Sequence, residues 1–162
     1  MRKVAYIDNH WGPGWPEIAS MQRYFIAPPG KQWVFDTANP DGVLILEGVD
    51  GTENLPAGKG RIDTHLTMWG DPSLGALLIY SKWGGIYEQT YSSKGDLIRL
   101  REIVLSYHNT PLPVGLFIPF ERAWKAVKEF METDGQLPKS IEWIANNDLP
   151  PNAFPDPHNV KI

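Results

Sequence analysis

The triplet Gly58-Lys59-Gly60 is the first place in the chain where residue types and spacing could support chemistry, because glycine and lysine together can cradle a phosphate. A phosphate-binding loop also needs a glycine five residues before Gly58 and a serine or threonine directly after the lysine. Glu53 and Gly60 occupy those two positions. The sequence therefore predicts no nucleotide phosphate site in this segment.

Acid–base or metal chemistry would depend on the four histidines, which are scattered and form no pair at metal-ligand spacing. The chain has no cysteine, which excludes a disulfide framework, a thiolate metal site, a cysteine nucleophile and the cysteine pair of the zinc deaminases. The missing catalytic constellation favours a binding protein that is not an enzyme and has no metal or cofactor. The alternative is a small enzyme or ligand-binding domain with a Trp- and His-lined pocket holding His65, Glu102 or His108.

Size and composition are those of one globular domain spanning 1–162. The chain has 162 residues, of which 42% are hydrophobic and 21% charged. The apolar stretch at the N-terminus is too short for a signal peptide, and no later run is long enough to span a membrane. The net charge of −4 gives no sign of a basic face for nucleic acid. We therefore expect a cytoplasmic protein without direct nucleic-acid or membrane contact.

Hydrophobic spacing and turn residues divide the first two thirds of the chain into short elements. Apolar residues at spacings of three and four predict a helix over 16–25. Alternating or continuous apolar runs bounded by Gly, Pro and Asp predict strands over 3–7, 31–36, 42–49, 61–69, 74–83 and 86–92. The last three form an antiparallel meander, and an exposed loop covers 50–60. Residues 97–107 fit either a helix or a strand, and we favour a strand in the C-terminal half.

The clearest element is a helix that Pro119 opens, with an apolar stripe that includes Trp124 and Phe130. Gly135 is suited to end it, and alternation predicts a strand over 140–144. Residues 146–162 look irregular. Together these elements predict an α+β fold, in which an antiparallel sheet of about five to six strands packs against two helices.

Charge is unevenly distributed along the chain. Residues 32–58 contain five acidic residues, Asp36, Asp41, Glu47, Asp50 and Glu53, and no basic one. A solvated surface that keeps the protein soluble is the simpler interpretation. The alternative is a face that docks on a basic partner such as a nucleic-acid enzyme, since complementary charge speeds association.

Residues 118–143 resemble the C-terminal signature of Imm family one, an immunity family of bacterial polymorphic toxin systems. The signature is a Pro-led amphipathic helix with a Val-x-x-Phe step, here Val127 and Phe130. A Thr-x-Gly-x-x-Pro break follows at 133–138, and then a strand that ends in Glu142-Trp143. The signature side chains Trp124, Val127, Phe130 and Trp143 belong to core faces, so we expect them to hold the fold and not to touch a partner.

The resemblance implies a cytoplasmic immunity protein that needs no cofactor, has no catalytic residue, and binds a cognate toxin domain, prominently a cytosine deaminase that acts on DNA. An acidic, aromatic surface would occlude the active site of the toxin. Contacts are expected from loops and exposed strand faces. The candidates for partner binding are Glu47, Asp50, Glu53, Trp69, Asp71, Trp83, Tyr87, Glu88, Tyr91 and Asp96.

Overall fold

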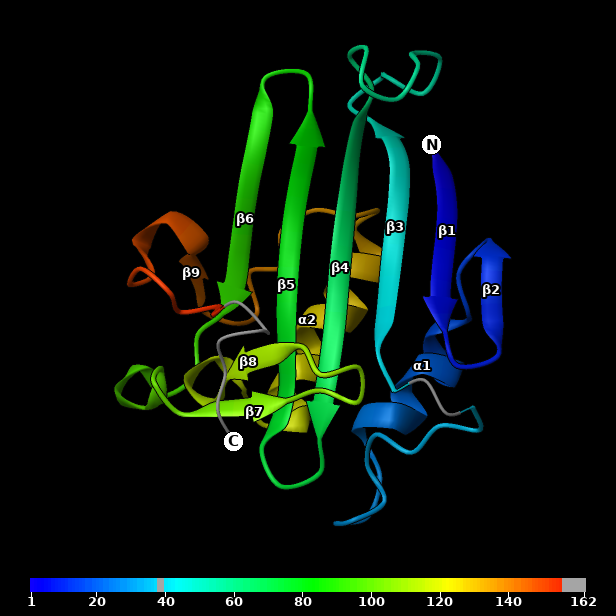
Figure 1. Cartoon of the computed structure of the whole chain (residues 1–162). Coiled ribbons are helices and arrows are strands. Elements are labelled where there is room, and N and C mark those ends of the chain that lie inside the picture. The colour runs from blue at the N-terminus through cyan, green and yellow to red at the C-terminus, as the bar shows by residue number, and fades with distance from the viewer. Residues whose placement is uncertain (38–39, 156–162) are drawn as a thin grey trace.

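The computed structural model describes residues 1–37 and 40–155, and it has the α+β fold that the sequence predicts (Figure 1). In this part of the chain seven strands form one antiparallel sheet. In spatial order they are β2 (His10–Pro13), β1 (Arg2–Ile7), β3 (Gly42–Val49), β4 (Ile62–Asp71), β5 (Gly75–Gly84), β6 (Tyr87–Ser93) and β9 (Trp143–Ala145). The sheet is larger than the five or six strands expected, because β2 contains Gly12 and Pro13 and its sequence is typical of a turn.

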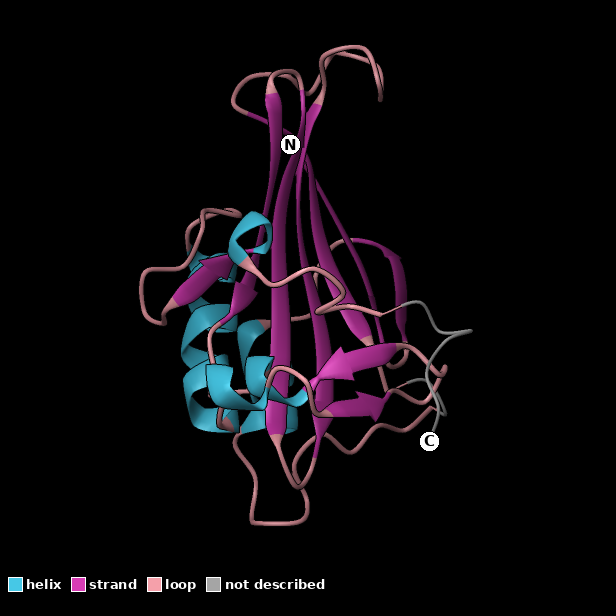
Figure 2. Cartoon of the chain, turned by 60° about the vertical axis from the view of Figure 1, so that its left-hand side comes forward, coloured by secondary structure: helices cyan, strands magenta, loops and turns pink. Residues whose placement is uncertain are grey.

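Two layers cover the sheet (Figure 2). The helices α1 (Ile18–Phe25) and α2 (Phe120–Glu132) pack on one face. The other face carries a two-stranded hairpin of β7 (Ile103–Leu105) and β8 (Pro111–Pro113). The 3-10 helices η1 (Leu97–Arg99) and η2 (Val114–Leu116) lie in the same layer. A third 3-10 helix, η3 (Asn146–Asp148), follows β9. Both layers lie toward one end of the sheet, and the long strands extend beyond them at the other end.

The predicted meander over β4, β5 and β6 is confirmed, with continuous antiparallel register in both pairs. Its middle strand is apolar on both faces because each face is covered. Leu78 belongs to the core between the sheet and the helices, whereas Leu77 points to the opposite side and packs with Leu112 and Leu116 beneath the hairpin. A strand buried on both faces has to be apolar without alternation.

The predicted C-terminal helix is also confirmed. Pro119 precedes α2, and its apolar stripe is buried, with Phe130 0% and Trp124 7% exposed. Gly135 adopts a φ of 85° and its backbone N–H donates to the carbonyl of Phe130 at 2.9 Å, which ends the helix. A side chain at Gly135 would collide with Thr64, so this glycine also permits the chain to pass close to the sheet.

The strand predicted over 31–36 is wrong. Trp33 adopts a left-handed φ of 59°, and its backbone N–H donates to the carbonyl of Tyr24 at 2.7 Å. The indole is 6% exposed and packs against Phe25 and directly over Gly70. The alternation of Trp33 and Phe35 imitates a strand, but the segment is a turn that places both rings on the core.

The C-terminal elements differ from the prediction in their bounds. The expected strand over 140–144 begins only at Trp143, and Ile141 is buried in the turn before it. In the ambiguous region 97–107, β7 lies in the C-terminal half as favoured, after the short helix η1. β8 has no strand pattern in the sequence, because prolines stand at both of its ends. Of the tail predicted to be irregular, 146–148 form η3 and 149–155 form no helix or strand, while 156–162 lie outside the described residues.

A buried carboxylate fixes the segment that follows Trp33. Asp8, 3% exposed, accepts hydrogen bonds from the Tyr24 hydroxyl at 2.8 Å and from the backbone N–H groups of Asp36 at 3.0 Å and Thr37 at 2.9 Å. Burial works to raise the pKa of Asp8, but these hydrogen bonds outweigh it and hold the pKa below its usual value. The interactions satisfy Asp8 locally and give it a role in the fold.

Candidate functional site

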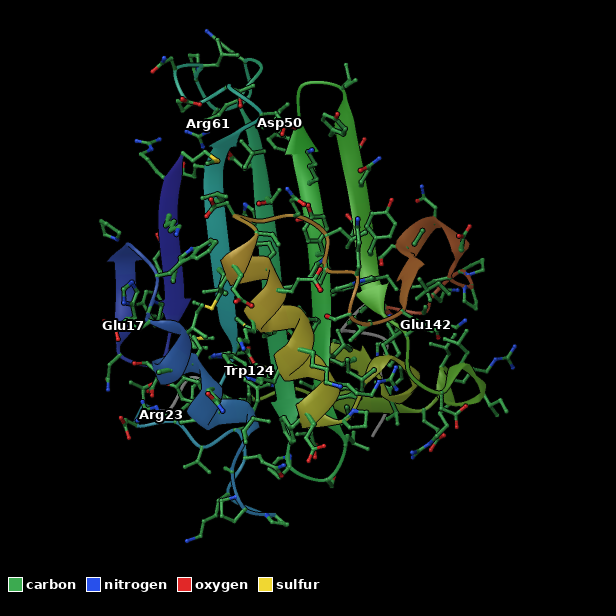
Figure 3. All side chains as sticks on the ribbon, turned by 180° about the vertical axis from the view of Figure 1, so that it is seen from behind. Glu17, Arg23, Asp50, Arg61, Trp124 and Glu142 are labelled. Carbon is green, nitrogen blue, oxygen red and sulfur yellow. The ribbon has the colours of Figure 1, made fainter. Side chains whose placement is uncertain are left out.

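The predicted partner-binding residues separate into two groups in the structure. Six of them lie where β3 ends, β4 begins, β5 ends and β6 begins, together with the 50–60 loop: Glu47, Asp50, Glu53, Trp83, Tyr87 and Glu88. This is the end of the sheet that extends beyond the helices and the hairpin, and Asp50 and Arg61 mark it in Figure 3, far from Trp124 on α2. The other four residues lie elsewhere.

Those four residues have local structural roles. Trp69 is half-buried and packs with Leu77 in the cluster beneath the hairpin, and Tyr91 packs against Tyr80 with ring centroids 6.5 Å apart. Asp71 accepts hydrogen bonds from the backbone and hydroxyl of Ser73 in the β4–β5 turn. Asp96 accepts a hydrogen bond from the backbone N–H of Ile98 and caps η1. The fold does not bring these four side chains to the end of the sheet.

Exposed apolar side chains gather at the end of the sheet. Trp83 is 52%, Ile86 94% and Leu55 44% exposed. A cleft of about 320 Å³ lies between the 50–60 loop and the tip of the β5–β6 hairpin. It is lined by Gly58 and Gly60 of the loop and by residues 83–88 of the hairpin. Sequence reasoning missed Ile86, although its place after Gly84-Gly85 at a two-residue hairpin turn was a signal that the side chain must face solvent.

We call the following residues the sheet-end surface: Glu47, Asp50, Glu53, Leu55, Trp83, Ile86 and Glu88.

Basic residues from other parts of the sequence neutralise much of the acidic run. Arg61 contacts Glu47 at 2.7 Å and Asp63 at 3.0 Å, and Arg2 approaches Glu47 at 3.4 Å. The side chain of Arg61 is only 14% exposed, so this cluster packs against the sheet. Asp63 also accepts a hydrogen bond from the backbone N–H of Gly48 at 3.0 Å, at the register shift between β3 and β4. The cluster therefore shapes the strand end and leaves little free charge.

The remaining acids of the run differ in their partners. Asp50 pairs with Lys82 at 2.8 Å, and the Lys82 ammonium lies 4.3 Å from the centroid of the Tyr87 ring, which is half-buried. Asp36 pairs with Arg23 at 3.6 Å, and burial raises the pKa of Asp41. Glu53 and Glu88 are exposed and form no ion pair among the described residues. The sheet-end surface thus has an apolar centre with two free carboxylates beside it.

The structure brings no catalytic constellation together in the part of the chain that it describes. His65 is half-buried on β4, and burial lowers its pKa below the usual value against the effect of Asp63 and Glu47, which raise it. Glu102 is exposed and pairs with Arg99 at 2.8 Å. The described residues hold no group of three potential metal ligands. A cleft of about 720 Å³, lined mainly by β1 and β2 with Leu46, Glu47 and Asp134, has neither His nor Trp in its lining. His158 lies outside the described residues.

Comparison with protein families gives a match. The model of the family described as Immunity protein Imm1 matches residues 48–145, which is more than half of the chain. The chain belongs to the Imm1 family of immunity proteins. Curated proteins and solved structures give no match. The matched range confirms the family that the signature at 118–143 resembles, and it also contains β4–β9, α2 and most of the sheet-end surface.

Family membership supports a role in immunity to a toxin and implies that the partner is a toxin protein. No helix in the described part of the chain has the length and apolarity that crossing a membrane requires. The helix that gives the family signature packs its apolar stripe inward, as expected. The fold thus separates the signature residues in the core from the exposed residues at the end of the sheet.

Proposed function

We propose that this protein binds a cognate toxin domain one to one, through the sheet-end surface, and holds the toxin inactive by occluding its active site. The observation that carries the proposal is the Imm1 match over 48–145, a range that includes Asp50, Glu53, Trp83, Ile86 and Glu88. The protein would act without catalysis or a cofactor, as a single domain in the cytoplasm, where it meets the toxin.

The composition of the sheet-end surface supports a protein-binding role. Binding energy at protein interfaces is concentrated in a few buried anchors, with Trp foremost, and polar contacts surround them and exclude water. Trp83 and Ile86 are exposed apolar side chains at the tip of one hairpin, and Glu53 and Glu88 flank them with unpaired charge. Neither apolar side chain belongs to a core cluster, so the fold does not require them where they are.

We further propose that the toxin acts on nucleic acid, as a deaminase of cytosine in DNA. A nucleic-acid enzyme presents a positive groove to its substrate. Glu53 and Glu88 would face that groove, while Trp83 and Ile86 fill its apolar part. Because Arg61, Arg2 and Lys82 neutralise Glu47 and Asp50, apolar contact would supply most of the affinity and charge would act mainly on the association rate.

Co-expression with the C-terminal domain of the toxin encoded beside this gene tests the proposal. We expect cells that make the toxin domain to survive only with this protein, and the purified pair to form a one-to-one complex. We also expect added protein to stop uracil formation in DNA by the toxin. Equal killing with and without the protein would contradict the immunity role. Protection against a toxin that forms no uracil would contradict only the deaminase assignment.

A further inference from the structure

The outer edge of β6 is paired along only part of its length. β9 pairs with Tyr91, Ser92 and Ser93, whereas residues 87–90 pair with β5 on the inner side and with no strand on the outer side in the described chain. Figure 1 shows the result, because β9 and the segment after it flank β6 near its arrowhead and leave its other half open. The sheet therefore has a free strand edge next to the sheet-end surface.

The pairing with β9 determines which backbone groups face outward. The N–H of Lys94 donates to the carbonyl of Glu142 at 3.1 Å, so the backbone of Lys94 points away from β5. Backbone groups in a strand alternate in direction from residue to residue. The N–H and C=O groups of Ser92, Thr90 and Glu88 consequently point outward as well. Ser92 lies opposite Ile144 of β9, and the same register continued past Tyr91 and Ala145 turns the Thr90 carbonyl toward Asn146. The Thr90 N–H and both backbone groups of Glu88 have no strand beside them in the described chain.

A polar groove lies along this free edge. It has a volume of about 580 Å³ and is lined by residues 88–91 of β6 and by 145–147, where β9 passes into η3. The Ser92 hydroxyl donates to the side-chain oxygen of Asn146 at 2.7 Å and holds the end of β9 in place. An added strand would occupy the position that β9 leaves empty and would meet a fixed boundary at Asn146.

The opposite edge of the sheet is protected, which makes the free edge of β6 a distinctive feature. β2 is only four residues long and ends at Pro13, which has no N–H to offer to another strand. Natural proteins shield edge strands with prolines, bulges and short lengths to prevent pairing with other chains. Residues 87–90 contain no proline, and their register with β5 has no bulge. Glu88 is the one charged side chain on this segment.

We propose that an extended segment of the toxin adds to the sheet as a strand beside Glu88–Thr90, and that it pairs with the outward N–H and C=O groups of Glu88 and with the outward N–H of Thr90. This inference rests on the proposed toxin-binding function. Such strand addition obtains affinity from backbone hydrogen bonds and specificity from alternate side chains. Glu88 belongs to both the groove and the sheet-end surface, so one partner can cover the two together.

The register of β5 and β6 also indicates the chemistry of the added strand. Glu88 lies opposite Trp83, with both side chains on the face of the sheet that carries the hairpin. A lysine or arginine of the toxin opposite Glu88 would therefore form a cross-strand ion pair and lie near the Trp83 ring. A second copy of this chain fits less well, because pairing this short edge with itself would place the two Glu88 side chains directly opposite or diagonal to each other.

Residue-resolved amide exchange tests the proposal, with the C-terminal domain of the toxin encoded beside this gene as the probe. In the free protein we expect the amides of Glu88 and Thr90 to exchange much faster than those of Gln89 and Tyr91, which point to β5. In the complex, Glu88 and Thr90 should become protected at least tenfold. Protection confined to Trp83 and the 50–60 loop would overturn strand addition and leave the proposed function intact. A wild-type chain that does not bind the toxin would overturn both.

A proline variant provides an independent measurement. Thr90→Pro removes an outward N–H that pairs with no strand among the described residues of the free protein. The unfolding temperature of Thr90→Pro should therefore lie within a few degrees of that of Thr90→Ala, which retains the N–H. We expect Thr90→Pro to raise the Kd for the toxin domain at least about tenfold above that of Thr90→Ala, because a backbone hydrogen bond is lost and the ring obstructs the added strand. Equal Kd values for the two folded variants would overturn the proposal. The proposal would also be overturned if the free protein were a homodimer and the toxin dissociated it without protecting the amides of Glu88 and Thr90.

Discussion

The two ends of the sheet are built from the same strands and differ in what covers them. At one end β5 places Leu77 and Leu78 on opposite faces, and both are 0% exposed beneath the hairpin and the helices. A few residues further along the same strand, Trp83 is 52% exposed. The covered end stabilises the fold, whereas the exposed end has large apolar side chains that the fold does not use. The comparison predicts that substitutions at the two ends will affect different measurements.

The largest effect is expected at the covered end. Phe130→Ala should reduce the free energy of unfolding by about 3–5 kcal/mol, because it leaves a cavity between α2 and the sheet. Trp124→Ala should fall in the same range. Denaturant unfolding measures both, and wild type should unfold in a single transition if 1–162 is one domain. A loss below about 1 kcal/mol would mean that the stripe of α2 does not form the core.

At the exposed end, Trp83→Ala should leave stability nearly unchanged and weaken toxin binding by about 2 kcal/mol or more, which is roughly a 30-fold rise in Kd. Trp11→Ala is the matched control, since Trp11 is 64% exposed but lies on β2 at the opposite edge. Titration calorimetry with the toxin domain gives both Kd values. Equal Kd values for the two variants would remove Trp83 from the interface.

A pair of isoleucines makes the comparison sharper. Ile86 is 94% exposed at the tip of the β5–β6 hairpin, and Ile98 is 93% exposed on η1. Ile86→Asp should raise the Kd about tenfold by burying a charge in the complex, while Ile98→Asp should bind as wild type does. Competition binding measures the ratio. If Ile98→Asp were the weaker binder, the interface would lie on the layer formed by η1 and the β7–β8 hairpin, at the covered end of the sheet.

The free carboxylates should produce a smaller, kinetic effect. Glu53→Gln with Glu88→Gln should slow association with a basic toxin about two- to fivefold at low salt and reduce its dependence on salt, because rim charges act mainly on the on-rate. Glu121→Gln with Glu132→Gln, on the exposed side of α2, is the control. Stopped-flow association across a salt series makes the measurement. An unchanged rate at low salt would indicate that these two carboxylates only solvate the surface.

The smallest effect concerns His65, which lies on β4 between the two ends. Burial lowers its pKa in the folded protein, so below about pH 6.5 the unfolded chain binds more protons than the folded one. The free energy of unfolding should therefore not depend on the protonation of His65 above about pH 6.5, and it should decline as the pH falls from there toward the pKa of His65 in the folded protein. His65→Gln should lessen this decline in urea unfolding at pH 7.5 and 5.5. An identical decline in the variant would assign the pH dependence to other groups.

The two ends also differ in how well the sequence predicts them. Local spacing was sufficient for α2 and for the meander of β4, β5 and β6, because amphipathic periodicity and turn glycines act over a few neighbouring residues. It was misleading at Trp33, where alternation is the same for a strand and for a turn that buries two rings. It gave no sign of β8, whose two prolines pair with β7 at the edge of a small sheet.

For the candidate site, residue types by themselves suggested Asp50, Glu53, Trp83 and Glu88, which the fold brings to one end of the sheet. They also suggested Trp69 and Tyr91, whose rings pack inward. They missed Ile86, which the glycine pair Gly84-Gly85 before it could have revealed, because Gly85 and Ile86 are the two turn residues between β5 and β6. The difference arises because exposure of an aromatic ring depends on what covers its strand face, and that cover comes from segments distant in the sequence.

The sequence by itself determined the helices with a strong apolar stripe, the meander and the family signature, because each is encoded by residues close together in the chain. Only the tertiary structure decided the charge of the sheet-end surface. The run 32–58 contains five acids and no base, yet Arg2 of β1, Lys82 of β5 and Arg61, which directly precedes β4, reach it and leave Glu53 without an ion pair among the described residues. Ion pairing depends on distance in space, and in an antiparallel sheet the nearest partner of a side chain is a residue of the neighbouring strand.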